Sequence, residues 1–358
     1  MKLSKKQRPW ILYAGLGFIM MVSLSVVSIG FLLLTPRAVQ APAPQAARQV
    51  NSTVSCNGHL LFMGDTMLAR NIGEQILAGK DPYRNVTSTL QKADLRIANV
   101  ETTIADSRVA KQAAGKLYTF NAPLEAIDIL KGANINVSVL ANNHTSDYGA
   151  AATTDMITRM NAAGLSTVGA GSTPAEAFAP RIKNVPMHCK SGTSSVKVAF
   201  IAANDIENNY TAVSNAQAGG AYFDKVLLTR SIKQARKAGA QFIIVIPHWG
   251  IEYHTTPTAR QTEWAHWFID NGADVVIGGH PHVMQPTETY KGHEIVYSMG
   301  NFIFDQMEGA DQGQMISLPV KQIVHVEGAN TTPESPSFGR VTSIRYHLDT
   351  RGFPVLNP

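Results

Sequence analysis

The strongest candidates for chemistry in this sequence are three histidines that follow two apolar runs. Phe242–Ile246 and Val275–Ile277 have the length and β-branched composition of buried strands; His248 follows the first run, and His280 and His282 follow the second. Side chains two residues apart in an extended segment point to the same face, so His280 and His282 are predicted to converge. Because imidazole is the commonest metal ligand, the pattern predicts a metal-centred site, although one histidine alone would fit a strand cap equally well.

A helical segment between the two runs would bring all three histidines to one place. Thr258–Asn271 has helical composition, and a strand, helix and strand in succession predict two parallel neighbouring strands. In open α/β sheets, sites form where the carboxyl ends of such strands emerge. His248 is therefore expected beside His280 and His282.

Polar residues follow other predicted strands in the same way. His59–Met63 leads to Asp65, Asp94–Val100 leads to Glu101, and Asn136–Leu140 leads to Asn143 and His144. Asp65 precedes a predicted helix over Thr66–Leu77 and could equally be its N-cap. Further strands are expected near the C-terminus, at Met315–Glu327 and Arg340–Leu348, where they would close a second sheet.

The predicted ligands together are two carboxylates, one amide and several imidazoles. This donor set suits one or two borderline divalent ions such as Mn, Fe or Zn. Such a site could activate a bound water and neutralise an anionic substrate group, with His144 as the proton donor. The predicted metal ligands are Asp65, Glu101, Asn143, His248, His280 and His282.

Residues flanking these ligands are candidates for substrate binding. Trp249, Glu252 and Asn301 are the residues we assign to a substrate cleft. For Trp249 and Glu252, packing or support of the ligands is the alternative. For Asn301, a turn or cap role is the alternative.

The N-terminus predicts a membrane anchor. Residues 1–9 form a basic tail with four Lys and Arg, and residues 10–34 are uncharged and long enough to cross a bilayer as one helix. The basic tail would remain inside, so the rest would lie outside the cell membrane. Cleavage near Ala38–Ala47 is the alternative. Residues 35–57, rich in Ala and Pro, are predicted to be a linker to one domain over 58–358.

Charge and cysteine content narrow the function further. The formal charge of +5 resides mostly in the basic tail, since the rest has 27 Lys and Arg against 26 Asp and Glu. Composition therefore gives no support for a nucleic-acid partner. The two cysteines, Cys56 and Cys189, could form a disulfide outside the cytoplasm or remain two unpaired thiols.

Six motifs in order resemble a known family. The segments GDTML, ANVET, ANNHTSDYG, PHWGIEY, GGHPHVMQ and YSMGNFIFD, over Leu60–Asp305, are similar to the capsule-synthesis CapA family, also called the poly-γ-glutamate synthesis PgsA family. The resemblance implies a calcineurin-like metallophosphoesterase fold, an α/β sandwich of two sheets flanked by helices.

The resemblance also implies roles for individual residues. Asp65 would belong to the first metal motif, and Glu101 stands where a bridging Asp is expected. Asn143 and His144 would be metal ligand and acid. His248 and His280 would complete one metal site, and His282 would belong to the other. The chain has Met67 where the usual first motif has a histidine ligand.

The implied function is synthesis or export of an anionic envelope polymer such as poly-γ-glutamate. The implied chemistry is metal-assisted hydrolysis or transfer at a phosphate ester or at an amide of the polymer. Other membrane proteins of a capsule synthesis complex are the expected partners. The alternative, which Met67 favours, is a non-catalytic polymer-binding or scaffold component that retains a vestigial metal site.

Overall fold

The computed structural model describes residues 52–112, 115–190, 192–206, 212–305, 309–327 and 330–357. The predicted basic tail, the predicted anchor over residues 10–34 and the linker up to residue 51 lie outside the described residues. Within the described part of the chain, no helix combines the length and apolar character that a membrane span requires.

Strand β1 (Ser52–Thr66) is the element that the rest of the fold shares. It pairs antiparallel with β16 (Gln312–Glu327) and β8 (Arg181–Cys189), and parallel with β2 (Leu95–Val100). β1 begins at Ser52, so the end of the segment predicted as linker belongs to the sheet. The early start follows from the pairing of Ser52–Phe62 with β16. This partner is distant in the sequence, so local composition does not reveal it.

One branch of the sheet runs in the order β6-β5-β2-β1-β16-β19-β20. The remaining strands of this branch are β5 (Val137–Val139), β6 (Ser166–Val168), β19 (Thr342–Leu348) and β20 (Pro354–Leu356). β15 (Asn301–Ile303) lies parallel to the end of β1, and β17 (Asn330–Pro333) and β18 (Ser337–Phe338) pair with β16.

The second branch runs in the order β13-β14-β12-β11-β9-β8 and meets the first at β1. Its strands besides β8 are β9 (Thr193–Asn204), β11 (Phe242–His248), β12 (Val275–Ile277), β13 (Thr287–Tyr290) and β14 (His293–Val296). Two small pairs stand apart: β3 (Thr103–Ile104) with β4 (Asn121–Ala122), and β7 (Ala170–Gly171) with β10 (Gly219–Gly220).

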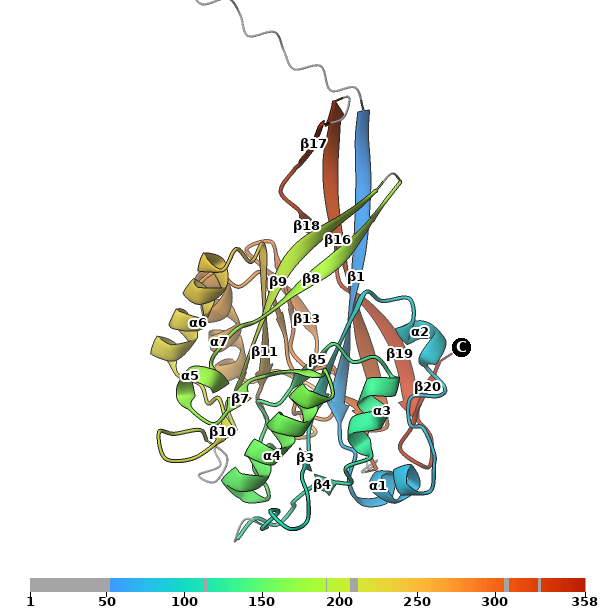
Figure 1. Cartoon of the computed structure of the whole chain (residues 1–358), viewed down its shortest axis with the longest axis vertical. Coiled ribbons are helices and arrows are strands. Elements are labelled where there is room, and N and C mark those ends of the chain that lie inside the picture. Colours follow the sequence, from blue (N-terminus) through green and yellow to red (C-terminus); the bar gives the residue numbers. More distant parts are fainter. Residues whose placement is uncertain are drawn as a thin grey trace, which may run out of the picture. The chain divides into compact units, whose positions relative to one another are not determined.

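Helices cover the outer face of each branch. α1 (Arg70–Leu77), α2 (Thr87–Leu90), α3 (Ala126–Gly132) and α4 (Gly149–Ala162) cover the first, and α5 (Pro174–Ala177), α6 (Lys225–Lys237) and α7 (Ala259–Asp270) cover the second. Figure 1 shows the two groups of helices on different sides of the strands. The predicted two-sheet sandwich is therefore present, with its two sheets joined through β1.

Alternation along the strands builds three cores. In β11, Ile244 and Ile246 face the other branch, whereas Ile243 and Val245 face α6 and α7. In β1, Leu60 and Phe62 face the space between the branches, and Leu61 and Met63 face α1–α4. A strand buried on both faces lacks the polar alternation of a surface strand, which explains the continuous apolar runs in the sequence.

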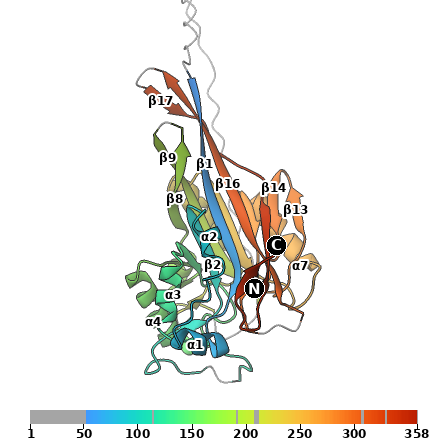
Figure 2. The ribbon, with the colours of Figure 1, turned by 90° about the vertical axis from the view of Figure 1, so that its right-hand side faces the viewer.

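The disulfide Cys56–Cys189 joins β1 to β8 at directly paired positions, which decides between the two alternatives for these cysteines. Figure 2 shows that β1, β16, β8 and β9 extend beyond the helices at the end of the sheet where this bond lies. Little apolar packing covers the N-terminal part of β1, since most of its residues before Gly58 are exposed or half-buried. The covalent link therefore holds this extension together.

Candidate metal centre

The predicted strand and helix order brings the ligand-bearing ends together. β11 and β12 are parallel neighbours, and α7 connects them after an N-cap at Thr258. β1, β2 and β5 are likewise consecutive parallel strands. Their carboxyl ends carry every predicted ligand, as the sequence pattern indicated.

The side chains of the two sheet branches meet in a buried cluster. His282 Nδ1 lies 3.2 Å from Asp65 Oδ2, and its Nε2 lies 3.9 Å from Glu101 Oε1. His248 Nε2 lies 3.6 Å from Glu101 Oε1 and 2.8 Å from Asn143 Oδ1. The ring centroids of His248 and His280 are 4.8 Å apart. Thus all six predicted ligands converge at one edge of the fold.

His280 and His282 converge by a route different from the predicted one. The segment is not extended: φ is 96° at His280 and 60° at His282. Left-handed backbone is unfavourable for residues with a Cβ, and such strain concentrates at functional sites. The backbone N–H of His280 also donates a hydrogen bond of 3.1 Å to Asp65 Oδ2. The turn thus aims both rings and closes over the Asp65 carboxylate.

The glycine before His280 is required by this close approach. A Cβ built on Gly279 would lie 2.6 Å from Asp65 Oδ1, which no side chain could accept without displacing the carboxylate. The G-G-H-P-H motif therefore contributes two ligands and also the glycine that the close approach to Asp65 requires.

The donor set fits a divalent metal ion. Two groups of three residues have ligand atoms within 4.8 Å of one another: Glu101, His280 and His282, and Asp65, Glu101 and His248. Glu101 belongs to both, so it would contact an ion held by either group. This grouping places His280 with His282, whereas the family resemblance paired it with His248.

Two buried atoms of this cluster have no hydrogen-bond partner among the described residues. They are Oε1 of Glu101 and Nδ1 of His280. Leaving a buried polar atom unsatisfied costs about 1–3 kcal/mol, so such atoms usually have a partner in the functional protein. A carboxylate oxygen and an imidazole nitrogen are both ligands of borderline divalent ions, so a bound ion would satisfy both atoms.

Burial and charge set the protonation of the histidines. Burial lowers the pKa of His248 to about 3 and holds the pKa of His280 well below its usual value. Burial would also lower the pKa of His282, but the hydrogen bond and charge of Asp65 raise it overall. His248 and His280 are consequently neutral near pH 7, which is the form that binds metal.

The two carboxylates differ from each other. Burial, then repulsion from Asp65, raises the pKa of Glu101 well above its usual value. Burial would likewise raise the pKa of Asp65, but the hydrogen bond and charge of His282 lower it overall. Without a cation, the site therefore favours a protonated Glu101 beside an ionised Asp65.

Asn99 is a central residue that the sequence pattern did not identify. Its Nδ2 donates to Asp65 Oδ1 at 2.8 Å and lies 3.4 Å from Glu101 Oε2. The same nitrogen is 3.3 Å from His248 Nδ1. Asn142 Nδ2 donates to Asn99 Oδ1 at 3.1 Å, which fixes the orientation of the Asn99 amide. Asn99 lies on β2, two residues before Glu101, which follows the strand. Side chains two residues apart in an extended segment share a face, and this spacing could have identified Asn99 from the sequence.

His144 is held by a network that includes two further residues missed in the sequence. Asp147 Oδ2 lies 2.7 Å from His144 Nδ1 and accepts from the backbone N–H of Phe120 at 2.8 Å. Lys116 forms an ion pair with Asp147 Oδ1 and donates to the carbonyl of Asn143. The Phe120 ring stacks on His144 with centroids 4.1 Å apart. Burial lowers the pKa of His144, and Asp147 partly offsets this.

Two of the three predicted substrate-binding residues make contacts within the fold. Trp249 has no exposed surface: it packs in the core under α6 and α7, and its Nε1 donates to the carbonyl of Tyr297 at 2.9 Å. Asn301 is also buried, with Oδ1 2.8 Å from His282 Nδ1. Both side chains are buried, Trp249 in the core and Asn301 against His282. Their predicted part in a substrate cleft stays a prediction. Glu252 is exposed, so its predicted role stays open.

Met67, which stands at the position of the missing ligand, belongs to the hydrophobic core. Its side chain is fully buried, and the backbone N–H of Ala69 approaches its sulfur at 3.1 Å. No other imidazole among the described residues takes its place in the candidate ligand groups. The position where the family resemblance expects a histidine thus supplies no imidazole ligand.

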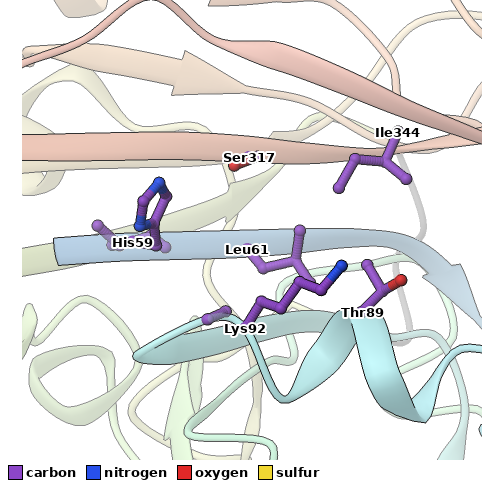
Figure 3. Close-up of a pocket in the computed structure, with 8 residues that line it drawn as sticks. His59, Leu61, Thr89, Lys92, Ser317 and Ile344 are labelled. Atoms are coloured by element: carbon purple, nitrogen blue, oxygen red, sulfur yellow. The ribbon is translucent and has the colours of Figure 1, made fainter.

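A separate pocket of about 380 Å³ lies along β1 beside α2 and β16 (Figure 3). His59, Lys92 and Thr89 line it with Leu61 and Ile344, and none of the predicted metal ligands does. Leu61 and Asp65 are four residues apart on β1, roughly 13 Å. The pocket is therefore distinct from the buried cluster.

Comparison with known proteins identifies a family. The family model described as bacterial capsule synthesis protein PGA_cap matches residues 59–306. The capsule biosynthesis protein CapA of Bacillus anthracis is 33% identical over 69% of this chain and 60% of its own length. The PGA biosynthesis protein CapA of Bacillus subtilis is 31% identical over 68% of this chain and 63% of its own length. The matched region thus spans about three fifths of these relatives.

Among solved structures, the calcineurin-like phosphoesterase YfkN from Bacillus subtilis is similar. It has a TM-score of 0.43 and 15% sequence identity, with 81% of this chain and 91% of that chain covered. The NAD nucleotidase of Haemophilus influenzae is similar with a TM-score of 0.42 and 10% identity, over 85% of this chain and 54% of that chain.

Proposed function

The chain belongs to the bacterial capsule synthesis protein PGA_cap family, and from this we propose that it serves the synthesis or export of an anionic capsule polymer such as poly-γ-glutamate. Its chemistry is metal-assisted hydrolysis or transfer at a phosphate ester or at an amide of that polymer. The observation that carries this proposal is the buried cluster in which Glu101 is common to both candidate ligand groups.

The ligands of one or two divalent ions are Asp65, Glu101, Asn143, His248, His280 and His282. When bound, such ions polarise an anionic oxygen and lower the pKa of a coordinated water. The chain itself supplies orientation and a proton. Asn99 holds Asp65 and His248 in place, and Asn301 holds His282. His144, oriented by Asp147, is the proton donor to the leaving group.

The proposal includes a single membrane helix over residues 10–34, with the C-terminal domain outside the cell membrane. The disulfide Cys56–Cys189 supports an oxidising compartment, because such bonds are rare in the cytoplasm. Other membrane proteins of a capsule synthesis complex are the proposed partners. An uncleaved anchor would keep the domain beside them.

A second candidate function is a polymer-binding or scaffold component with a vestigial metal site. Met67 favours it, because the apolar side chain supplies no imidazole ligand where the family resemblance expects a histidine. In that case the metal ion would stabilise the fold without turnover.

Metal content and turnover separate the two functions. The full chain would be purified with Mn, its bound metal measured by mass spectrometry, and phosphodiester and γ-glutamyl amide substrates screened. The enzyme is expected to show metal-dependent turnover that His282→Ala abolishes and His188→Ala, at an exposed position away from the cluster, leaves unchanged. Bound metal without turnover on either substrate class would establish the scaffold instead.

A further inference from the structure

The groove between α6 and α7 carries a row of basic side chains along one helix face. The groove has a volume of about 640 Å³, and its α6 wall includes Lys225, Arg230, Lys233 and Lys237. Positions 226, 229, 230, 233, 234 and 237 all line it. This spacing places them on one face of a helix, with the opposite face, at Leu228, Ile232 and Ala235, in the core.

Three of these cations have no partner among the described residues. No hydrogen bond or ion pair within that part of the chain involves the side chains of Arg230, Lys233 or Lys237, and all three residues are exposed. The neighbouring acids are engaged elsewhere. Asp274 pairs with Arg236, Asp270 with Lys291, and Glu263 lies 3.7 Å from Lys225. The positive potential of the row is therefore not neutralised by the protein.

The second wall of the groove differs in chemistry. Trp267 of α7 and Asn271, the C-cap of α7, line it, together with Val226 of α6, which is exposed by 69%. An indole face can pack against methylene groups, while an amide can donate to or accept from a peptide group. None of the lining residues carries a negative charge. The groove combines a cationic side with an apolar and amide side.

We propose that this groove binds a linear polycarboxylate as a second site, away from the metal centre. From Arg230 to Lys237 the row extends roughly 10 Å along the helix axis, which suits several successive carboxylates of an extended chain rather than one small anion. Trp267 packs on the methylene groups between them. The identification of this polymer with the capsule polymer rests on the proposed function. The groove and its charge are independent of that function.

The direction of the row relates it to the metal centre. Asn204 is paired with His248 in the sheet and with Tyr222 just before α6. α6 therefore begins at the sheet edge where His248 lies, and Lys237 is roughly 18 Å further along the helix. Figure 1 shows α6 and α7 on the outer side of β11. A chain bound along the groove would thus lie away from the buried ligands, and the N-terminal end of α6 is the end nearer to them.

The test compares two triple variants of the full chain with matched loss of charge. One combines Arg230→Ala, Lys233→Ala and Lys237→Ala; the control combines Lys80→Ala, Lys131→Ala and Lys321→Ala, which are exposed and outside the groove. Alanine preserves the helix, and metal content and the melting temperature verify folding. The probe is a fluorescently labelled, γ-linked glutamate oligomer of about ten residues, and its binding is measured by fluorescence anisotropy.

The groove variant is expected to bind the oligomer roughly tenfold more weakly, since each exposed ion pair contributes a factor of about 1.4–5. The control is expected to bind like the wild type. Equal affinity for all three proteins, or equal loss in both variants, would overturn the proposal. So would tighter binding of duplex DNA than of the oligomer.

The metal-site variant His280→Ala keeps this result separate from the proposed function. If the groove variant loses oligomer binding while His280→Ala retains it, the second site stands whether or not the metal centre is catalytic. If only His280→Ala loses binding, the groove proposal is overturned and the metal centre alone holds the polymer.

Discussion

The buried carboxylate of Asp147 lies 2.7 Å from Nδ1 of His144 and at the same time pairs with the half-buried Lys116. This arrangement fixes the tautomer of His144 and leaves its other nitrogen, Nε2, for proton transfer. Asp147 is therefore a positioning residue for the proposed acid.

Replacing Asp147 by Asn is expected to lower the pKa of His144 further, because the nearby negative charge that raises it is lost. The unpaired Lys116 would also destabilise the fold, by about 3 kcal/mol. NMR titration of the histidine ring and urea unfolding measure the two effects. Asp106→Asn, which breaks solvent-exposed ion pairs with Arg108 and Arg159, is the control and should lower stability much less. An unchanged His144 pKa would remove Asp147 from the proposed mechanism.

Replacing Asn99 by Leu is expected to weaken metal binding by about 10–100-fold, the usual effect of removing a group that orients ligands. The substitution keeps side-chain size but removes the amide that contacts Asp65 and His248. Metal titration of the chelated protein gives the affinity. The matched control is Asn121→Leu; among the described residues, the bonds of the Asn121 amide go to the backbone of Ala105. If both variants bound metal like the wild type, Asn99 would have no role in the site.

Divalent metal is expected to raise the melting temperature more at pH 8 than at pH 5. The pKa values of Glu101 and His282 are raised in the folded protein. They therefore stabilise the metal-free fold at a pH below the ordinary pKa of each group, and this contribution is lost as the pH rises through the folded-state pKa. A bound metal ion must displace these protons. Protons therefore compete less with the metal ion as the pH rises, and metal binding becomes stronger. Thermal unfolding with Mn and with a chelator, at both pH values, measures the difference. A larger shift at pH 5 would contradict this assignment of protons.

Reducing the Cys56–Cys189 bond is expected to lower the free energy of unfolding by about 2–5 kcal/mol, because it closes a loop of 133 residues. Urea unfolding with and without reductant measures this loss. The double variant Cys56→Ser, Cys189→Ser should match the reduced protein and be insensitive to reductant. Equal midpoints for the oxidised wild type and the double variant would show that the bond contributes nothing.

Replacing Trp249 by Ala is expected to cost about 3–5 kcal/mol, since the indole is fully buried and would leave a cavity. Trp249→Phe should lose much less and keep its metal content. If Trp249→Ala were as stable as the wild type but bound the oligomer more weakly, the residue would line a substrate cleft after all.

Much of the fold was predictable because buried parallel strands produce a strong local signal. Phe242–Ile246 and Val275–Ile277 are apolar on both faces, and the helix between them begins with a capping box at Thr258. These local features also place His248, His280 and His282 just past the strand ends, whereas the left-handed turn that aims His280 and His282 was not predicted. The early start of β1 was not predictable, because Ser52–Asn57 is held by β16 and by Cys189, which are distant in the sequence.

The supporting residues of the site were missed for a related reason. Asn99 and Asp147 are common residue types whose roles depend on which side chains face them across the sheet. The place of Trp249 next to His248 in the sequence likewise does not reveal that its side chain turns into the core. Ligands at strand ends can be found from local sequence, whereas the groups that orient them depend on tertiary contacts.

β1 connects the start of the described domain directly to the Asp65 carboxylate. Every residue from Ser52 to Phe62 is paired with β16. Tension applied to the chain before Ser52 would therefore load these pairs in shear, where they resist together rather than opening one by one. If the domain is tethered at this end, as proposed, force on the tether would be carried by the paired ribbon of β1 and β16 before it reached Asp65.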